Sequence, residues 1–205
     1  LLLLLLLLLS LGVTVSTVVH LQKRIIGGQT CGKNERQYHV KLSTDPTGTS
    51  LLCGGSLVSK QWILTAAHCK FPGNIYYLML LKLPSPTEIK PVGLPDCKTP
   101  KIGDKVQVAG YGATGTGPNN ELDIEVVDPR FLETTSYQHL FCAKTPKVDI
   151  SKGNSGGGVV YKDRIYGVIT FSGARTHAFV KPAVFMNIYH ESYLRWITQT
   201  VGVDA

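Results

Sequence analysis

Short apolar stretches separated by turn-forming residues recur along the chain after residue 36. They are rich in Val, Ile, Leu, Tyr and Phe, a pattern that predicts β-strands rather than helices. Clusters of Gly, Pro, Asn and Asp, such as residues 115–120, predict the turns between them. The expected strands cover residues 37–42, 50–58, 62–66, 105–109, 157–161, 164–171 and 183–189.

Only the last segment of the chain has a helical period. In residues 191–200, Tyr193, Leu194 and Ile197 can share one face of a helix. Strands and helices do not alternate along the chain, which argues against a parallel α/β sheet. Many short strands followed by one terminal helix predict an all-β protein built from antiparallel barrels or a sandwich.

The first 19 residues are mostly apolar and open with leucines at positions 1–9. This pattern resembles the apolar region of a secretory signal peptide, with Thr14, Val15 and Ser16 as a small-residue cleavage site. A signal anchor is the alternative, because nineteen such residues could just span a bilayer, but the Ser and Thr residues of the second half favour a cleaved signal. No methionine precedes the leucines, so we expect the sequence to begin inside the signal peptide. After signal removal we expect no stable membrane insertion.

A short polar connector, residues 20–24, follows and ends in Lys23 and Arg24. The next residue is the apolar Ile25, and a basic residue in an exposed connector is a preferred site of tryptic cleavage. We therefore expect an activating protease to cut between Arg24 and Ile25. Residues 20–24 would be a short activation propeptide, and residues 25–205 the mature domain.

Composition narrows the classes of function. The chain has 205 residues, 43% of them hydrophobic, which is enough for a globular domain with a sizeable core. The formal net charge is +7, but Lys and Arg are scattered, which favours a solvated, mildly cationic surface and leaves weak polyanion binding open. No concentrated basic or aromatic face indicates nucleic acid. The five cysteines and six histidines lack metal-ligand spacing, so no metal or other cofactor is expected.

Candidate chemistry lies in the glycine-rich stretch 153–158, which contains Ser155. Flanking glycines leave a serine hydroxyl uncrowded and allow a tight turn whose N–H groups can face a substrate oxygen. Such turns also occur in ordinary hairpins, so this stretch alone is weak evidence. Upstream, His68 lies in residues 64–69 and is a candidate general base for the serine.

Five stretches form an ordered set along the chain: Arg-Ile-Ile-Gly-Gly at 24–28, Cys-Gly-Gly-Ser-Leu-Val at 53–58, Trp-Ile-Leu-Thr-Ala-Ala-His-Cys at 62–69, Gly-Tyr-Gly at 110–112 and Gly-Asn-Ser-Gly-Gly at 153–157. In this order they match the trypsin-like (chymotrypsin-fold) serine proteases, and the chain resembles that family over nearly all of residues 25–205. The resemblance implies an all-β fold of two antiparallel six-stranded β-barrels, with the active site between them, and a C-terminal helix.

The resemblance assigns roles to individual residues. Ser155 falls on the nucleophile and His68 on the general base. The backbone N–H groups of Gly153 and Ser155 fall on the oxyanion hole. Cys53 and Cys69 match the half-cystines that hold the histidine loop against its neighbouring strand.

Two departures from the family concern catalysis directly. Tyr77 stands where the family has the aspartate that orients the histidine, and the connection from Cys69 to Tyr77 is much shorter than in the family. We therefore expect the first barrel to lack two or more strands. Asn154 replaces the aspartate that binds the new N-terminus, here that of Ile25, after cleavage.

The substrate-binding pocket gives mixed signals. Asp149 falls on the position that pairs with an Arg or Lys substrate side chain, whereas Ser172 and Ala183 fall where trypsin-like members have glycines and would narrow the pocket. Ser151 replaces a cysteine that braces the pocket, which is similar to the granzyme, mast-cell chymase and cathepsin G branch.

The sequence thus predicts a secreted trypsin-like serine endopeptidase that acts on polypeptides through an acyl-enzyme and is impaired by loss of the triad aspartate. Its other partners would be protein inhibitors, and storage in granules stays open. The alternative is a catalytically inactive homologue that acts as a secreted binding protein. The abrupt junction before residue 77 favours an internal stretch missing from the sequence, whereas Asn154 and the narrowed pocket favour the inactive homologue.

Overall fold

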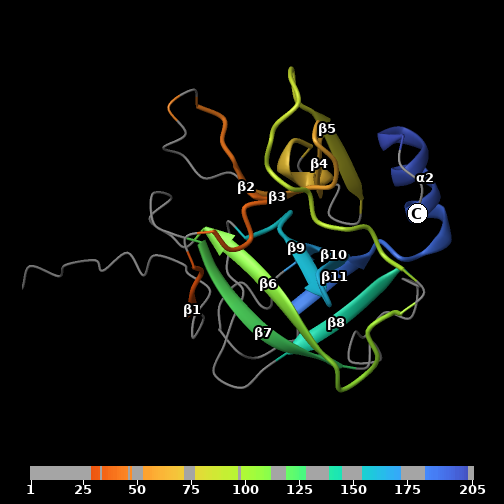
Figure 1. Cartoon of the computed structure of the whole chain (residues 1–205). Coiled ribbons are helices and arrows are strands. Elements are labelled where there is room, and N and C mark those ends of the chain that lie inside the picture. Colours follow the sequence, from red (N-terminus) through yellow and green to blue (C-terminus); the bar gives the residue numbers. More distant parts are fainter. Residues whose placement is uncertain are drawn as a thin grey trace, which may run out of the picture.

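Among the residues that it describes, the computed structural model has two antiparallel β-sheets and one α-helix, α2 (Figure 1). The larger sheet has the strand order β1-β7-β6-β9-β10-β11-β8, and the smaller one the order β2-β3-β4-β5. The residues that the structure describes are 29–32, 34–45, 47, 53–71, 77–96, 98–111, 119–127, 139–144, 154–171 and 183–202.

The larger sheet closes on itself. Its strands are β1 (Gln29–Thr30), β6 (Lys105–Tyr111), β7 (Asn119–Val127), β8 (Leu140–Lys144), β9 (Gly158–Tyr161), β10 (Arg164–Phe171) and β11 (Ala183–Asn187). β7 also pairs with β8, which closes the strands from β7 to β8 into a ring. β1 lies outside this ring and pairs with residues 120–121 of β7. Six strands therefore form a ring, which confirms the expected second barrel.

The smaller sheet stays open among the described residues. It contains β2 (His39–Leu42), β3 (Cys53–Leu57), β4 (Trp62–Ala66) and β5 (Leu78–Lys82). β5 is the last strand and pairs only with β4, in a register that places Leu80 opposite Leu64. A first barrel with fewer than six strands agrees with the short connection seen in the sequence.

Several predicted elements match the structure, and others were missed. The expected strands 62–66 and 164–171 coincide with β4 and β10, and the helix α2 (Glu191–Val201) ends one residue later than expected. No strand was expected over β7 or β8. The predicted turn at 115–120 is wrong for Asn119 and Asn120, because their backbones pair with Tyr111 and Gly110 of β6. Backbone pairing overrides the low strand propensity of asparagine there.

The two sheets share a hydrophobic core. One buried cluster combines Leu64 and Ala66 of β4 with Ile165 and Val168 of β10. Ile197 of α2 is fully buried in the same cluster, and Tyr193 packs against it. The apolar face of the helix therefore packs against the core that the two sheets share, and Tyr193 and Ile197 lie on one face as the sequence predicted.

The chain between the sheets is bonded to both of them. The N–H of Val92 donates to the carbonyl of Leu57 in β3 (3.0 Å), and the N–H of Ile165 in β10 donates to the carbonyl of Gly93 (2.9 Å). Backbone hydrogen bonds thus fix the position of residues 92–93 relative to both sheets.

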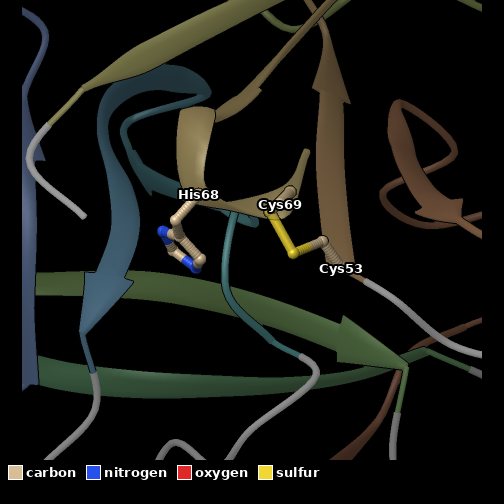
Figure 2. Close-up of side chains that lie close together, drawn as sticks. All are labelled: Cys53, His68 and Cys69. Carbon is tan, nitrogen blue, oxygen red and sulfur yellow. A yellow bond between two sulfur atoms is a disulfide. The ribbon is translucent and has the colours of Figure 1, made fainter. Parts of the chain in front are cut away.

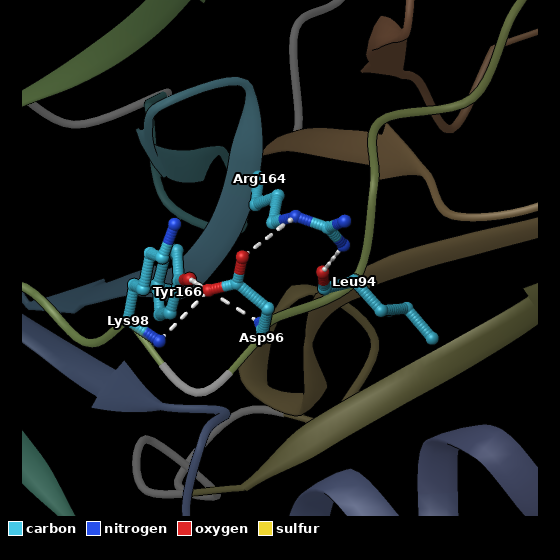
Figure 3. Close-up of polar contacts among 5 residues, drawn as sticks. All are labelled: Leu94, Asp96, Lys98, Arg164 and Tyr166. Carbon is cyan, nitrogen blue, oxygen red and sulfur yellow. Dashed lines mark hydrogen bonds and ion pairs between the residues drawn. The ribbon is translucent and has the colours of Figure 1, made fainter. Parts of the chain in front are cut away.

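Side chains continue this attachment (Figure 3). The Asp96 carboxylate accepts hydrogen bonds from the Tyr166 hydroxyl (2.5 Å) and the Lys98 N–H (2.9 Å), and its Oδ2 lies 3.3 Å from Nε of Arg164. Arg164 also donates to the carbonyl of Leu94 (2.7 Å). The Tyr166 hydrogen bond lowers the pKa of Asp96, while burial raises the pKa of Tyr166 to about 12. Asp96 is therefore ionised and Tyr166 neutral at physiological pH.

Candidate active site

His68 lies in a single 3₁₀ turn, η1 (Ala67–Cys69), directly after β4. The N–H groups of Lys70 and Phe71 both donate to the carbonyl of Ala67, at 3.1 and 2.9 Å, and close the turn. A disulfide (S–S 2.09 Å) joins Cys69 to Cys53 at the start of β3, as the family resemblance implies. The turn is thus fixed to its neighbouring strand by a covalent bond.

The imidazole of His68 lies beside this disulfide (Figure 2). One ring nitrogen and the two sulfur atoms lie within 4.8 Å of one another. Because both sulfurs are in the disulfide, only the imidazole could act as a metal ligand, and one ligand does not make a metal site.

Ser155 lies in a tight loop before β9 that is bonded to both sheets. Its carbonyl accepts a hydrogen bond from the N–H of Gly54 in β3 (2.8 Å). The next residue, Gly156, donates its N–H to the carbonyl of Ile169 in β10 (2.7 Å). The serine hydroxyl is therefore carried by a backbone that both sheets hold, and the side chain is half-buried.

A glycine is required at position 156. Its backbone has φ +82°, and a Cβ there would collide with the Thr65 hydroxyl and the Gly54 carbonyl. These two groups are themselves bonded, because the Thr65 hydroxyl donates to the Gly54 carbonyl (2.8 Å). The loop thus approaches β3 and β4 as closely as only glycine permits.

Gly156→Ala is expected to lower the free energy of unfolding by about 2–4 kcal/mol, from the clash and the left-handed backbone together. Gly103→Ala is the matched control, since Gly103 also has a positive φ (+91°) but open space around its Cβ position. That control should lose about 1 kcal/mol from backbone strain alone. Urea unfolding would measure both, and equal losses would contradict the close approach.

The structure brings the His68 and Ser155 segments together. Cys69, the neighbour of His68, has its sulfur 4.0 Å from the carbonyl of Ser155. Within the described residues, no hydrogen bond joins the His68 ring to the Ser155 hydroxyl. Such bonds are often long in enzymes without substrate, so a base at His68 and a nucleophile at Ser155 are compatible with this arrangement.

No described residue forms a hydrogen bond that would orient the imidazole of His68 through its inner nitrogen, Nδ1. Nδ1 of His68 is buried and has no hydrogen-bond partner among the described residues. Burial lowers the pKa of His68, so the ring is neutral at physiological pH. A neutral ring can act as a base, but no described residue near Nδ1 selects the tautomer that leaves Nε2 free to accept a proton.

Tyr77 lies next to the histidine turn. Its carbonyl accepts a hydrogen bond from the N–H of Ala67 (2.8 Å), which fixes the backbone of residue 77 beside that turn. The Tyr77 side chain is 61% exposed. Burial, and then the neighbouring Tyr77, raise the pKa of Tyr193 on α2.

Asn154, the residue before Ser155, is almost completely buried, with 1% of its surface exposed. Both atoms of its side-chain amide lack a hydrogen-bond partner among the described residues. An unsatisfied buried amide costs about 1–3 kcal/mol, so this position resembles a receptor site for a polar group.

One neighbour of this loop, His39 of β2, was not identified by any sequence motif. His39 is buried, and its ring packs against the backbone of Gly54 and Gly157. A Cβ atom added to Gly54 would lie 3.0 Å from Cε1 of His39, and one added to Gly157 would lie 3.3 Å from it. Burial, and then the charge of Arg36, lower the pKa of His39 to about 4. His39 is therefore neutral and fills the space beside the serine loop. Its position in a strand predicts burial, but not this contact.

The remaining expected site residues divide into two groups. Ala183 begins β11 and packs in the core of the second barrel with Ile169 and Phe185, and its place in a substrate pocket stays a prediction. The others lie outside the described residues: Gly153, Asp149, Ser172, Arg24, Ile25 and the signal segment 1–19. In the described part of the chain, no helix is long and apolar enough to cross a bilayer.

Comparison with known proteins adds an independent line of evidence. A family model described as Trypsin matches residues 25–71 and 71–197, in two parts that meet at residue 71. The snake venom serine protease serpentokallikrein-1 of Protobothrops mucrosquamatus is 26% identical over 232 residues, covering 87% of each chain.

Two mammalian relatives have similar identity. Glandular kallikrein of Sus scrofa is 27% identical over 248 residues, covering 88% of this chain and 97% of its own. Cationic trypsin-3 of Rattus norvegicus is 28% identical over 233 residues, covering 88% and 91%. These alignments are longer than the 205 residues of this chain, so the relatives contain residues with no counterpart here.

Proposed function

Because the chain belongs to the trypsin family of serine proteases, we propose that it hydrolyses peptide bonds slowly, with Ser155 as nucleophile and His68 as general base. We infer a low rate because Nδ1 of His68 is buried and has no hydrogen-bond partner among the described residues. In a complete triad a carboxylate occupies that place.

The proposed reaction has two halves. Nε2 of His68 removes the proton of the Ser155 hydroxyl as its oxygen attacks the scissile carbonyl. The N–H groups of Gly153 and Ser155 stabilise the resulting oxyanion, and His68 returns the proton to the leaving amine. Water then attacks the acyl-enzyme with His68 again as base, which releases the acid and restores the serine.

A missing carboxylate explains the low rate in physical terms. The imidazolium that forms during attack would have no negative charge behind it, and part of the ring population would hold its proton on Nε2. Loss of the aspartate from a related triad costs about 10⁴ in kcat. The family match that breaks at residue 71 supports a shortened connection between η1 and β5, where that carboxylate would be expected.

The finer features of this activity come from sequence. Asp149 supports a preference for Arg or Lys in the substrate, although Ser172 and Ala183 reduce the room for a long side chain. Cleavage after Arg24 by an activating protease would release the N-terminus of Ile25 toward Asn154. The apolar N-terminal segment supports secretion, with polypeptide substrates and protein inhibitors as partners.

The test is an amidase assay of protein cleaved after Arg24, with Arg, Lys and Leu substrates. We expect slow hydrolysis, fastest for Arg or Lys, and Ser155→Ala should reduce kcat by about 10². This loss is smaller than in an intact enzyme, because triad members act as a unit and one is already absent.

Other outcomes of the assay decide against the proposal. A rate close to that of an intact trypsin would contradict the missing orienting group. A rate that Ser155→Ala leaves unchanged would favour the second candidate, an inactive homologue that binds polypeptides or inhibitors. Asn154 favours that candidate, because its amide has no partner among the described residues and, without a charge, would bind the new N-terminus more weakly than an aspartate.

A further inference from the structure

The edge strand β5 is unusually apolar for an exposed sheet edge. Its sequence is Leu78-Met79-Leu80-Leu81-Lys82, and the four apolar residues are each partly exposed. Natural proteins protect such edges with charged residues, prolines or bulges, since unpaired backbone groups attract other strands. β5 has only Lys82 at its end.

The hydrogen bonds at both ends of β5 show which backbone groups face outward. The Tyr77 carbonyl accepts from Ala67, and the Leu83 N–H donates to the carbonyl of Gln61, both at 2.8 Å. Odd-numbered positions therefore bond to β4, because the bonded groups of a strand alternate between its two sides. The N–H and C=O groups of Leu78, Leu80 and Lys82 point the other way, where no described strand pairs with them.

The strand is held firmly in place despite this open edge. Leu78 and Leu80 pack against the core cluster that contains Leu64 and Ile197. The ammonium of Lys82 lies 5.6 Å from the ring centroid of Trp62, its direct neighbour on β4. The edge is therefore a preformed template, which costs little ordering entropy when another strand pairs with it.

We propose that β5 pairs with β5 of a second copy of this chain, antiparallel about a two-fold axis at Leu80. In this register Leu80 faces Leu80, Leu78 faces Lys82, and Met79 faces Leu81. Leu78, Leu80 and Lys82 then form the hydrogen-bonded pairs of the new ladder. The outward N–H and C=O groups of one copy therefore meet those of the other copy.

Charge placement also favours a second copy in this register. Lys82 faces an apolar residue rather than another lysine. The two lysines lie about 13 Å apart along the ladder, beyond the Debye length of about 8 Å at physiological ionic strength. The strand is short, so the dimer is weak and its dissociation constant falls in the micromolar range or above. This inference does not depend on the proposed function.

Sedimentation velocity of protein purified after expression of the whole chain tests the dimer, from about 1 to 200 μM. A monomer–dimer equilibrium is expected that strengthens with added salt, because each copy carries a net charge of +7. Leu80→Pro should weaken dimerisation at least about tenfold with a folded monomer, since it removes an outward N–H. Leu81→Pro, the matched control, should instead unfold the edge by breaking its bond to β4.

Residue-resolved hydrogen exchange of the unaltered protein gives a second measurement, which decides the question even if Leu80→Pro does not fold. Amide protection of Leu78, Leu80 and Lys82 should rise with protein concentration, while that of Met79 and Leu81 should not change. A protein that is monomeric at 200 μM, or a dimer that a folded Leu80→Pro variant leaves intact, would overturn the proposal.

Discussion

Tyr77→Asp is expected to raise kcat for amide hydrolysis by about 10²- to 10⁴-fold. The backbone of residue 77 is already fixed beside the histidine turn by its bond to Ala67, and Nδ1 of His68 is buried and has no partner among the described residues. A carboxylate there would accept a hydrogen bond from the N–H at Nδ1, leave Nε2 free to act as base, and stabilise the imidazolium.

Tyr77→Asn is the matched control, because it has the same size and can accept a hydrogen bond but carries no charge. We expect it to recover only a small part of the gain. The pH profile gives a second readout: burial lowers the pKa of His68, so the base form persists at lower pH. A carboxylate neighbour raises that pKa, which should move the acidic limb of the Tyr77→Asp profile to higher pH. No gain in rate with an unmoved limb would show that residue 77 cannot reach the imidazole.

Asn154→Asp is expected to make folding stability depend on cleavage after Arg24. Before cleavage the variant places a carboxylate where only 1% of the residue is exposed and the described residues offer no partner for its side chain. An uncompensated buried charge costs about 3–5 kcal/mol, so the uncleaved variant should melt well below the unaltered protein. After cleavage the Ile25 ammonium can pair with it, and stability and activity should rise together.

Asn154→Leu separates charge from packing in that experiment. Its side chain has a similar volume and no polar atoms, so replacing an unsatisfied amide should leave stability equal or slightly higher, with no response to cleavage. Thermal melts of cleaved and uncleaved proteins give the comparison. If cleavage stabilises Asn154→Leu as much as Asn154→Asp, the position does not bind the new N-terminus.

Strands with strong local patterns could be predicted from the sequence. β4 and β10 are rich in apolar residues, and the predicted ranges matched them at each end. In β7 the apolar residues Leu122, Ile124 and Val126 alternate with acidic ones, which is the period of a half-buried strand. The prediction missed this strand because its two opening asparagines indicate a turn, and only the pairing with β6 shows that they extend it.

The candidate site divides in the same way. The resemblance to the family implied the Cys53–Cys69 disulfide, which the structure contains, and it proposed roles for His68 and Ser155. The environment of each group could not be predicted. The buried Asn154 amide, which has no hydrogen-bond partner among the described residues, and the contact of His39 with the serine loop depend on how segments far apart in the sequence pack together.

The backbone of residues 92–93, bonded to both sheets, and the serine loop, likewise bonded to both, attach the halves of the molecule at two separate places. Neither half can tilt against the other without breaking hydrogen bonds at one of these two places. The bonds of the Asp96 carboxylate to the Tyr166 phenol and the Arg164 guanidinium further stabilise the first of them. Substrate recognition by the proposed enzyme should therefore not depend on domain closure, and heat should unfold both sheets in a single cooperative step.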